Sequence, residues 1–299
     1  MTAPPAEGTS RATVGAAVQV GTEVSINLGS SLAGLVIPAV GAPIVVAARQ
    51  LVMLVTVAPF YRPGRTRLSW PTLWPALLLG VDLAVMNLSF YSSVHLLGLG
   101  VAATIEFLGP LAVALIMSRR PLDAACAIVA AIGVFLLTGP DGAPNLPGVA
   151  LALTAAAAWA CYIALTRRVA LTLPGLDGLT IGGAVSLLIL LPLAASTSAG
   201  PHFSPQVLLL LLAVGVLSSA LPYSLDTFIL RRIPPRLYAI ITAFGPVIAA
   251  TFGALVLGER FTPLEVAAIL LVCTAAGTAL ATSRRLPESD LERTAEALP

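Results

Sequence analysis

The sequence predicts an all-α polytopic membrane protein in which ten transmembrane helices form two inverted five-helix repeats. Three observations lead to this fold class. The composition is far from that of a soluble domain, with 58% hydrophobic residues, 10% charged residues and a mean hydropathy of +0.96. The arginines gather in every second segment between the apolar runs. One Gly-Pro motif also occurs twice, five apolar runs apart.

The apolar runs have the length of membrane-spanning helices, because about 20 helical residues cross roughly 30 Å of hydrocarbon. Ten runs are long enough: 13–33, 41–60, 71–93, 97–118, 122–139, 147–167, 176–195, 206–228, 236–257 and 263–282. The segments between them are short, so we expect no separate soluble domain. The two repeats should cover 13–139 and 147–282, flanked by polar cytoplasmic tails at 1–12 and 283–299. The first tail lacks the features of a cleavable signal peptide.

The arginines orient the predicted helices. All sixteen basic residues are arginine. If residue 1 is cytoplasmic, fourteen of them fall in cytoplasmic segments: Arg11, Arg62, Arg65, Arg67, Arg119, Arg120, Arg167, Arg168, Arg231, Arg232, Arg236, Arg284, Arg285 and Arg293. Arg260 then lies in an outer loop, and Arg49 lies inside a span. Because cytoplasmic loops carry an excess of basic residues, this asymmetry predicts that both termini face the cytoplasm.

An internal repeat supports the same topology. The segment IEFLGPLAVAL at 105–115 resembles ITAFGPVIAAT at 241–251, with the Gly-Pro pairs in register. The first lies in the fourth span and the second in the ninth, so the repeat unit is five spans. An odd number of crossings makes the second copy insert upside down. This is the plan of secondary transporters, whose sites lie near the middle of the membrane at broken helices.

The two Gly-Pro pairs, Gly109-Pro110 and Gly245-Pro246, predict kinks in the fourth and ninth spans. Proline has no backbone N–H, so the carbonyl four residues before it loses its helical partner. In the first copy that residue is Glu106, which places a carboxylate and a freed carbonyl at one point in the middle of the membrane. Polar groups at that depth are costly and usually functional. A purely structural kink with a satisfied carboxylate is the alternative.

The first span carries a polar stripe. Gln19, Glu23, Asn27 and Ser30 are spaced by four, four and three residues, which places them on one helical face. In lipid such a face turns toward the protein interior or toward water. The stripe therefore lines a pathway, which we favour, or makes hydrogen bonds to neighbouring helices.

The second span contains Arg49 near its centre, and an arginine does not lose its proton in proteins. Arg49 is therefore a counter-ion to Glu23 or Glu106, or it binds an anionic group of a substrate; the sequence leaves both open.

In the third span, Asn87 is one turn before Tyr91 on the same face, whereas Asp82 points elsewhere. The sixth span offers Trp159 and Tyr162 as packing residues or as a cavity wall, and the eighth span offers Tyr223 at helical spacing from Ser219.

Acids outnumber bases in the centre of the predicted membrane region. Glu23, Asp82 and Glu106 against Arg49 leave a formal charge of −2 if all four are ionised. Carboxylates in such a place tend to take up protons or to meet a cation. A small zwitterion, or coupling to protons, would suit this setting. The candidate substrate-binding or coupling residues are Glu23, Asn27, Arg49, Asp82, Asn87, Tyr91, Glu106, Trp159, Tyr162 and Tyr223.

Other classes of protein have little support in the sequence. Cys126, Cys161 and Cys273 each lie alone in an apolar run, so we expect neither a disulfide nor a metal site. No basic face with interleaved aromatic residues indicates nucleic-acid binding. The chain has no HExxH, GxSxG or paired-aspartate motif, and neither histidine lies at mid-depth, so we expect no enzyme and no cofactor. A passive channel is disfavoured because no filter motif is present.

Several stretches carry a family resemblance: SLAGLVIPAVGAP at 31–43, MNLSFY at 86–91, GVAATIEFLGPLAVALIMSRRPLD at 100–123, WACYI at 159–163, SSALPYSLD at 218–226, RRIPPR at 231–236 and LGERFTPLE at 257–265. With them the chain resembles the drug/metabolite transporter superfamily, EamA type, and most closely its threonine/homoserine exporters. The resemblance implies ten helices in two inverted repeats in the plasma membrane. It also implies outward movement of small amino acids, usually coupled to the proton gradient.

The chain departs from those exporters at two positions. Gly245-Pro246 stands where they typically have Glu-Pro, and Asp82 stands where a small residue is usual. The leading hypothesis is a secondary active transporter that exports small amino acids by alternating access, with Glu106 as the proton-coupling acid and Glu23 as its rival. The alternative is an exporter of other small metabolites or lipophilic drugs, with a mainly apolar cavity. The expected partners are a zwitterionic substrate, protons and membrane lipids, and a homodimer is left open.

Overall fold

The computed structural model describes residues 6–61, 69–116, 121–138, 145–174, 176–197, 203–222, 225 and 235–282, with side chains from residue 13 onward. Within these residues every regular element is a helix. Seven helices are long and apolar enough to cross a membrane, and three shorter apolar helices cover Leu99–Val113, Ala124–Thr138 and Pro205–Ala220. The prediction of an all-helical, multi-pass membrane protein is therefore confirmed.

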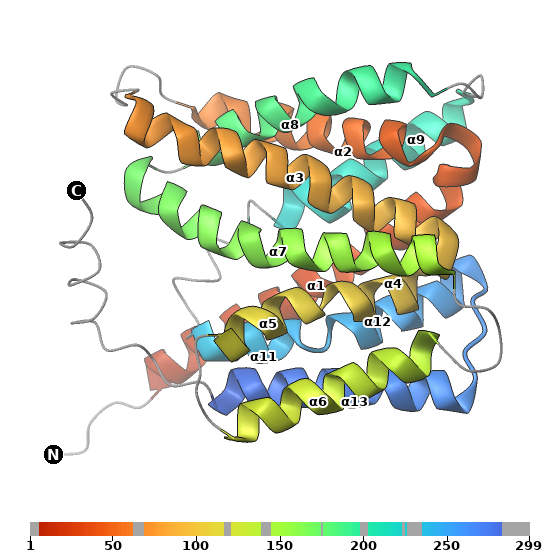
Figure 1. The fold of residues 1–299 in the computed structure, drawn as a ribbon. Coiled ribbons are helices and arrows are strands. Elements are labelled where there is room, and N and C mark those ends of the chain that lie inside the picture. Colours follow the sequence, from red (N-terminus) through yellow and green to blue (C-terminus); the bar gives the residue numbers. More distant parts are fainter. Residues whose placement is uncertain are drawn as a thin grey trace, which may run out of the picture.

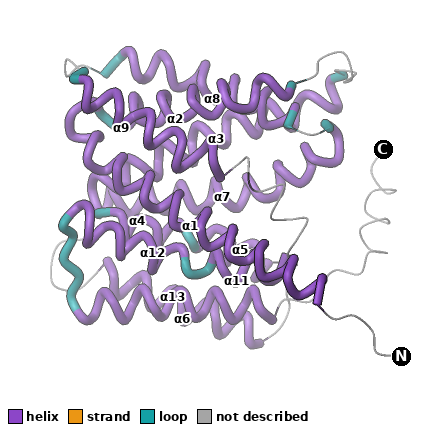
Figure 2. Tube along the Cα trace, turned by 180° about the vertical axis from the view of Figure 1, so that it is seen from behind, coloured by secondary structure: helices purple, strands orange, loops and turns teal. Residues whose placement is uncertain are grey.

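The helices lie side by side in a bundle (Figures 1 and 2). In the first half of the chain they are α1 (Ala6–Val40), α2 (Ala42–Val57), the short 3-10 turn η1 (Ala58–Phe60), α3 (Trp70–Leu97), α4 (Leu99–Glu106), α5 (Leu108–Ile116) and α6 (Pro121–Thr138). In the second half they are α7 (Leu146–Thr172), α8 (Asp177–Ala195), α9 (Pro205–Gly215), the π-helical turn η3 (Val216–Ala220), α11 (Pro235–Thr242), α12 (Gly245–Phe252), the π-helical turn η4 (Gly253–Leu257) and α13 (Pro263–Thr282). The start of α1 and the end of α13 lie at the same end of the bundle, on the left in Figure 1.

Local sequence explains where several helices begin. Proline occupies the first turn of α2, α3, α7 and α9, where its missing N–H is no loss because that turn has no helical acceptor. The side chain of Asn145 accepts a hydrogen bond from the N–H of Gly148 at the start of α7, and Ser204 accepts one from Val207 at the start of α9. These hydrogen bonds fix the residues at which α7 and α9 begin.

Two helices are interrupted at the Gly-Pro motifs. The helical path through the fourth predicted span stops after Glu106 and resumes at Leu108, two residues before Pro110. The path through the ninth stops after Thr242 and resumes at Gly245, immediately before Pro246. Both interruptions lie inside the bundle, where α4 packs against α12.

The packing of the two halves is reciprocal. In one set of contacts, α3 packs along α7 and α8, while α7 also contacts α4 and α5. In the matching set, α9 packs along α1 and α2, while α1 also contacts α11 and α12. Three further pairs, α2 with α8, α4 with α12 and α6 with α13, join the two halves of the chain. In Figure 1, α6 and α13 form the bottom layer, and α2, α8 and α9 lie at the top.

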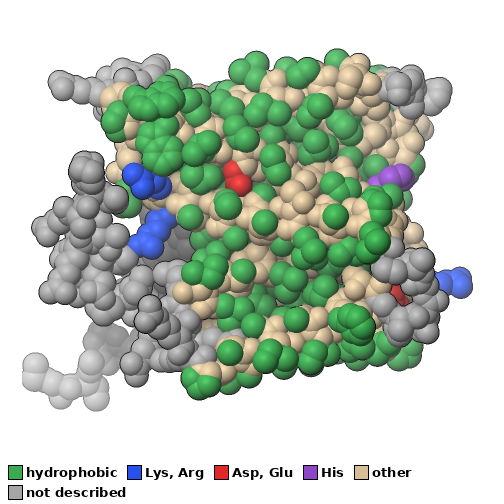
Figure 3. Space-filling view, in the orientation of Figure 1, with side chains coloured by type: hydrophobic (Ala, Val, Ile, Leu, Met, Phe, Trp, Pro, Cys, Tyr) green, Lys and Arg blue, Asp and Glu red, His purple; other side chains and the backbone are tan. Residues whose placement is uncertain are grey.

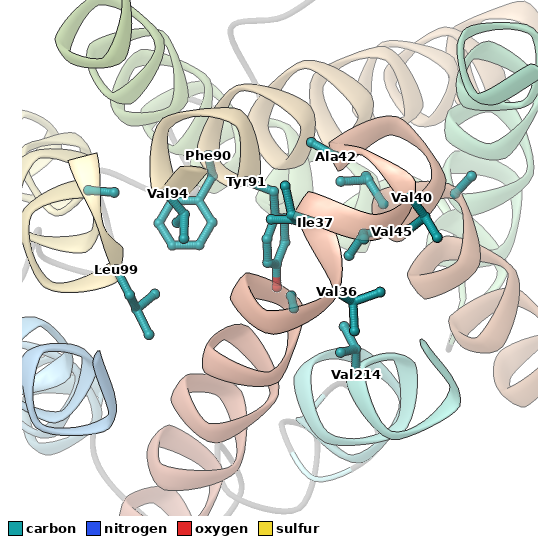
Figure 4. Packing of buried hydrophobic residues seen from close by; sticks show 14 of the residues in the cluster. Val36, Ile37, Val40, Ala42, Val45, Phe90, Tyr91, Val94, Leu99 and Val214 are labelled. Carbon is teal, nitrogen blue, oxygen red and sulfur yellow. The ribbon is translucent and has the colours of Figure 1, made fainter. Parts of the chain in front are cut away.

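The largest buried apolar cluster joins helices of both halves of the chain around Tyr91, and Figure 4 shows part of it. Its labelled members come from α1 (Val36, Ile37 and Val40), α2 (Ala42 and Val45), α3 (Phe90, Tyr91 and Val94), α4 (Leu99) and α9 (Val214). Because lipid is as apolar as these side chains, their burial stabilises the bundle mainly through close packing and not through transfer from water.

The outer surface is apolar, as expected for a bundle in lipid. Figure 3 shows hydrophobic side chains across the middle of one face, with the visible basic side chains toward its two ends. Large exposed side chains include Val55, Ile116, Phe135, Leu171, Leu188 and Leu255. A soluble monomer rarely exposes apolar surface on this scale.

Candidate functional site

The polar stripe of α1 is buried and meets two different partners. Gln19, Glu23, Asn27 and Ser30 are all buried, each no more than 7% exposed. At one end of the stripe, Gln19 contacts the interruption between α11 and α12. At the other end, Ser30 lies 3.2 Å from the hydroxyl of Tyr91 on α3. Figure 4 shows this hydroxyl pointing toward α1. The stripe therefore runs between two polar clusters.

The first cluster surrounds Glu23. The Nε2 group of Gln19 donates to Glu23 Oε1 at 3.1 Å and to the hydroxyl of Thr242 at 3.2 Å. Glu23 Oε2 lies beside Gly245, 3.5 Å from the position that a Cβ would take there. The carboxylate of Glu23 thus lies against the interruption in the ninth predicted span, with its orientation set by Gln19.

The second cluster surrounds Arg49 of α2. Its Nε donates to the hydroxyl of Ser219 at 2.5 Å, its Nη2 donates to the carbonyl of Ser218 at 2.7 Å, and its Nη1 donates to Asn87 Oδ1. The guanidinium carbon is 5.4 Å from the centre of the Tyr91 ring, which is within the range of a cation–π interaction. Three elements, α2, α3 and η3, therefore hold one guanidinium in place.

Among the described residues, Arg49 is hydrogen-bonded to no acid. Its hydrogen bonds and its ring contact are all with neutral groups. Arg49 is thus not a directly bonded counter-ion to Glu23 or Glu106 in this structure, although its charge acts on Glu106 from a distance. A guanidinium has five N–H donors, and the three bonds to protein groups leave donors that can bind an anion.

Glu106 is the last residue of α4 and precedes the interruption. It lies deep in the bundle, where the positive charge of Arg49 acts on it from beyond hydrogen-bonding distance. Glu106 as a whole is partly buried by surface exposure. The next residue, Phe107, packs edge-on against Trp159 of α7, with ring centres 5.7 Å apart. Trp159 therefore lies beside the interruption.

The remaining candidates lie elsewhere. Asp82 is nine residues from Tyr91, or two and a half turns, so it points to the opposite side of α3. It is half-buried, and its Oδ2 has no hydrogen-bond partner. Tyr162 packs with Leu79 and Leu83 in a separate apolar cluster between α3 and α7. Tyr223 lies outside the described residues. The two clusters thus leave out Asp82 and Tyr162.

Four residues of the two clusters were not on the list of candidates. Gln19 belongs to the stripe, so its spacing pointed to it. Thr242 precedes the second Gly-Pro pair by the same four-residue step as Glu106, which is a usable signal. Ser219 was noted only for its helical spacing from Tyr223. No sequence signal marks Ser218, because its contribution is a carbonyl turned toward Arg49 by the π-helical turn η3.

The described residues contain no group of three His, Cys, Asp or Glu side chains placed to hold a metal ion. The two clusters instead combine one fixed cation, oriented carboxylates and neutral hydrogen-bonding groups inside an apolar bundle. Interrupted helices around such a polar centre are typical of membrane transporters for small polar molecules.

Comparisons with known proteins identify the family. A model described as the EamA-like transporter family matches residues 146–281. The threonine/homoserine exporter RhtA of Salmonella typhimurium is 38% identical over 267 residues, which cover 88% of this chain and 90% of the exporter. RhtA of Escherichia coli is 38% identical over 264 residues, covering 87% and 89%. The chain therefore belongs to the EamA-like transporter family, within the drug/metabolite transporter superfamily, as the sequence resemblance predicted.

The fold is also that of a solved structure. A crystal structure of a protein with 19% sequence identity superposes with a TM-score of 0.65, over 91% of this chain and 98% of the other. This likeness concerns the fold alone. The relatives with high identity are exporters and not enzymes, which agrees with the lack of catalytic motifs in the sequence.

Proposed function

We propose that the chain exports small amino acids of the threonine and homoserine type across the plasma membrane, by alternating access and in exchange for protons. The observation that carries this proposal is the Arg49 guanidinium, which is held in the centre of the bundle by neutral groups alone. A buried charge without a counter-charge is costly. A substrate carboxylate would supply that counter-charge.

The contacts of Arg49 suit a carboxylate ligand. A planar guanidinium binds a carboxylate through two parallel hydrogen bonds, which adds geometric selectivity to the charge attraction. Asn87 and Ser219 hold the plane of the group from two sides, and Tyr91 lies against its face. The hydroxyl of Tyr91 is in turn held by Ser30. These contacts keep the guanidinium of Arg49 in one orientation while substrate molecules bind and leave.

Two observations favour an amino acid as the substrate: the activity of the relatives and the acidic side chains near Arg49. The two relatives are exporters of threonine and homoserine. An amino acid carries an ammonium group as well as a carboxylate, and the site offers Glu23 and Glu106 in addition to Arg49. A ligand with both charges would therefore be neutralised on both sides. These features favour a zwitterion over a simple organic acid.

The proposed architecture has ten membrane crossings in two inverted repeats. The seven long helices and the three shorter apolar ones would together make ten crossings. The reciprocal packing of the two halves is what a pseudo-two-fold axis in the membrane plane would produce. The start of α1 and the end of α13 lie at one end of the bundle, in keeping with an even number of crossings. The arginine distribution favours the cytoplasm for that end.

Proton coupling is assigned to Glu106, with Glu23 as the rival. Glu106 is partly buried and lies next to the interruption between α4 and α5. A carboxyl group at a helix interruption can change its access to water when the two halves of the helix move. Glu23, by contrast, is tied to Gln19 and lies against Gly245.

The experiment is counterflow in proteoliposomes. Vesicles preloaded with unlabelled homoserine should accumulate labelled threonine or homoserine through the wild-type protein, and Arg49→Gln should abolish that accumulation. Arg260→Gln is the matched control, since Arg260 is exposed outside the site, and it should transport normally. If the wild type moves no amino acid in this assay, the proposed function is wrong.

The alternative, export of other metabolites or lipophilic drugs, predicts an apolar cavity in which Arg49 is paired internally. Within the described part of the chain, Arg49 is hydrogen-bonded to neutral groups and to no acid, which disfavours this alternative for uncharged drugs. Other metabolites that carry a carboxylate are competing candidates for the substrate. The same assay tests each of them: a true substrate, preloaded into the vesicles, drives uptake of the labelled compound.

A further inference from the structure

An unusual excess of hydrogen-bond acceptors faces the interruption between α11 and α12. Gln19 is only 1% exposed, and its Oε1 has no hydrogen-bond partner. The orientation of this amide is determined by its neighbours, because Nε2 is needed to donate to Glu23 Oε1 and to the Thr242 hydroxyl. Buried polar atoms are nearly always paired, so Gln19 Oε1 is an acceptor open to a donor from outside the chain.

Two further acceptors are directed to the same place. Pro246 has no N–H, so it cannot donate to the carbonyl of Thr242 four residues earlier. Glu23 Oε2 lies 3.5 Å from the Cβ position of Gly245, directly against the backbone at the interruption. The cluster thus offers an amide oxygen, a backbone carbonyl and a carboxylate oxygen from two helices.

We propose that Gln19, Glu23 and Thr242 bind the ammonium group of the transported amino acid while Arg49 binds its carboxylate. This inference rests on the proposed function and adds the second half of the binding site. A primary ammonium has three N–H donors and one positive charge, which match three acceptors that include one carboxylate. Glu23 is then the acid for substrate binding, and Glu106 is left for protons.

The two clusters adjoin neighbouring turns of α1. Glu23 and Gly29 are six residues apart, which corresponds to about 9 Å of rise between their backbone positions. Gly29 packs directly against Ser218, whose carbonyl binds Arg49.

Glu106 is less suited to this role. Its carboxyl group has no hydrogen-bond partner among the described residues, so nothing there sets its orientation. The carboxylate of Glu23, by contrast, is oriented by Gln19, and the side-chain amide of Asn27 donates to the backbone carbonyl of Glu23 at 2.9 Å. Orienting partners of this kind give a charged site its selectivity.

The test compares two ligands that differ in one group. Purified protein in detergent is titrated at one pH with homoserine and with 2,4-dihydroxybutyrate, in which a hydroxyl replaces the ammonium. The wild type should bind homoserine about 10- to 100-fold more tightly, since hydrogen bonds to charged groups are lost with the analogue. Glu23→Gln and Gln19→Leu should bring the ratio close to one. Ser31→Ala, on the same helix with its hydroxyl bonded to the carbonyl of Leu28, should keep the wild-type ratio.

Each other outcome overturns the inference. A wild-type ratio near one, or an unchanged ratio in Glu23→Gln, means that the cluster does not bind the ammonium. Loss of the ratio in Glu106→Gln, with retention in Glu23→Gln, assigns the ammonium to Glu106. If Glu23→Gln does not fold, the ratio measured for Gln19→Leu takes its place: a ratio near one supports the inference, and an unchanged ratio contradicts it. Wild-type protein that binds neither homoserine nor threonine contradicts the proposed function itself, whereas homoserine binding without discrimination contradicts the inference alone.

Discussion

At the scale of single residues, the chemistry of the site depends on how each charge is held. Arg49 is fixed by an amide, a hydroxyl and a carbonyl, so its charge is oriented without being neutralised. Glu23 is held by a neighbouring amide, and Glu106 has no such tie. One cation and two acids that are held differently are what the proposed binding of a zwitterion and the proposed proton coupling require.

Replacement of Arg49 by lysine separates charge from geometry. Arg49→Lys keeps the positive charge, but an ammonium has three N–H donors, too few to replace the three bonds of Arg49 to protein groups and a two-pronged bond to a substrate carboxylate. We expect counterflow of homoserine to fall about 10- to 100-fold, the equivalent of one or two charged hydrogen bonds. Arg260→Lys provides the control. Equal rates for Arg49→Lys and the wild type would reduce Arg49 to a structural role.

Glu106→Gln tests the coupling acid. Glutamine mimics the protonated carboxyl group, so the variant should still exchange substrate across the membrane while losing accumulation driven by a pH gradient. Glu23→Gln, measured in the same vesicles, should lose both activities, because it weakens substrate binding. If Glu106→Gln keeps full pH-driven transport and Glu23→Gln retains exchange alone, the coupling acid is Glu23.

At the scale of elements, the two Gly-Pro interruptions share a motif but differ in packing. A Cβ at Gly109 would collide with the backbone carbonyl oxygen of Ala156, so α5 and α7 approach each other through this glycine. A Cβ at Gly245 would meet only Glu23 Oε2, at the ordinary contact distance of 3.5 Å. The first glycine is thus required for helix packing, and the second leaves room for a carboxylate.

This difference predicts opposite outcomes for two alanine variants. Gly109→Ala should destabilise the folded protein by about 1–3 kcal/mol, as overpacking does, and Gly109→Leu should abolish transport. Gly245→Ala should leave the thermal midpoint in detergent nearly unchanged. Gly21→Ala is the control, since no atom lies within 4 Å of its Cβ position. Equal midpoints for Gly109→Ala and Gly21→Ala would show that α5 and α7 are free to separate.

A second element-scale contact joins the two halves at one end of the bundle. Glu259, between η4 and α13, accepts hydrogen bonds from the N–H groups of Leu99 at 2.5 Å and Gly100 at 3.2 Å at the start of α4. Gly98 has φ = 84° and packs against the same carboxylate. A carboxylate at a helix N-terminus is favourable, so this contact links the two halves at one end of the bundle and closes the gap between η4 and the start of α4.

Removal of the Glu259 carboxylate should weaken the contact between the two halves of the chain. Glu259→Ala should destabilise the protein by about 1.5–3 kcal/mol, because two charge-assisted hydrogen bonds between the halves are lost. Glu265→Ala is the matched control, since Glu265 caps its own helix α13 through Thr262, and it should cost about 1 kcal/mol. Thermal unfolding in detergent measures both. A smaller effect for Glu259→Ala than for Glu265→Ala would contradict the closing role.

At the scale of the whole molecule, the helices form an apolar bundle with a narrow polar centre. The proposed pseudo-two-fold axis relates α4 with α5 to α11 with α12, and each interrupted helix supplies one side of that centre. Rocking of one half against the other would move Arg49 and Glu106 relative to the two ends of the bundle.

The proposed orientation is testable by labelling. In a background with Cys126, Cys161 and Cys273 replaced by alanine, Arg260→Cys should react with a membrane-impermeant maleimide added to intact cells. Pro174→Cys, between α7 and α8, should react only after the membrane is opened. The reverse pattern would place both termini outside the cytoplasm. Labelling of both sites in intact cells would contradict the proposed number of crossings.

The sequence by itself determined what depends on neighbouring residues along the chain. Hydropathy identifies the apolar helices, helical spacing identifies the buried stripe of Gln19 and Glu23, and the Gly-Pro motif identifies the two interruptions. Each of these features depends on side chains within a few turns of one another. The tertiary structure alone decided which groups meet. Arg49 bonds Ser219, 170 positions away, and Gln19 bonds Thr242, 223 positions away. Such contacts arise from the packing of distant helices, where charge and helical period leave many pairings equally acceptable.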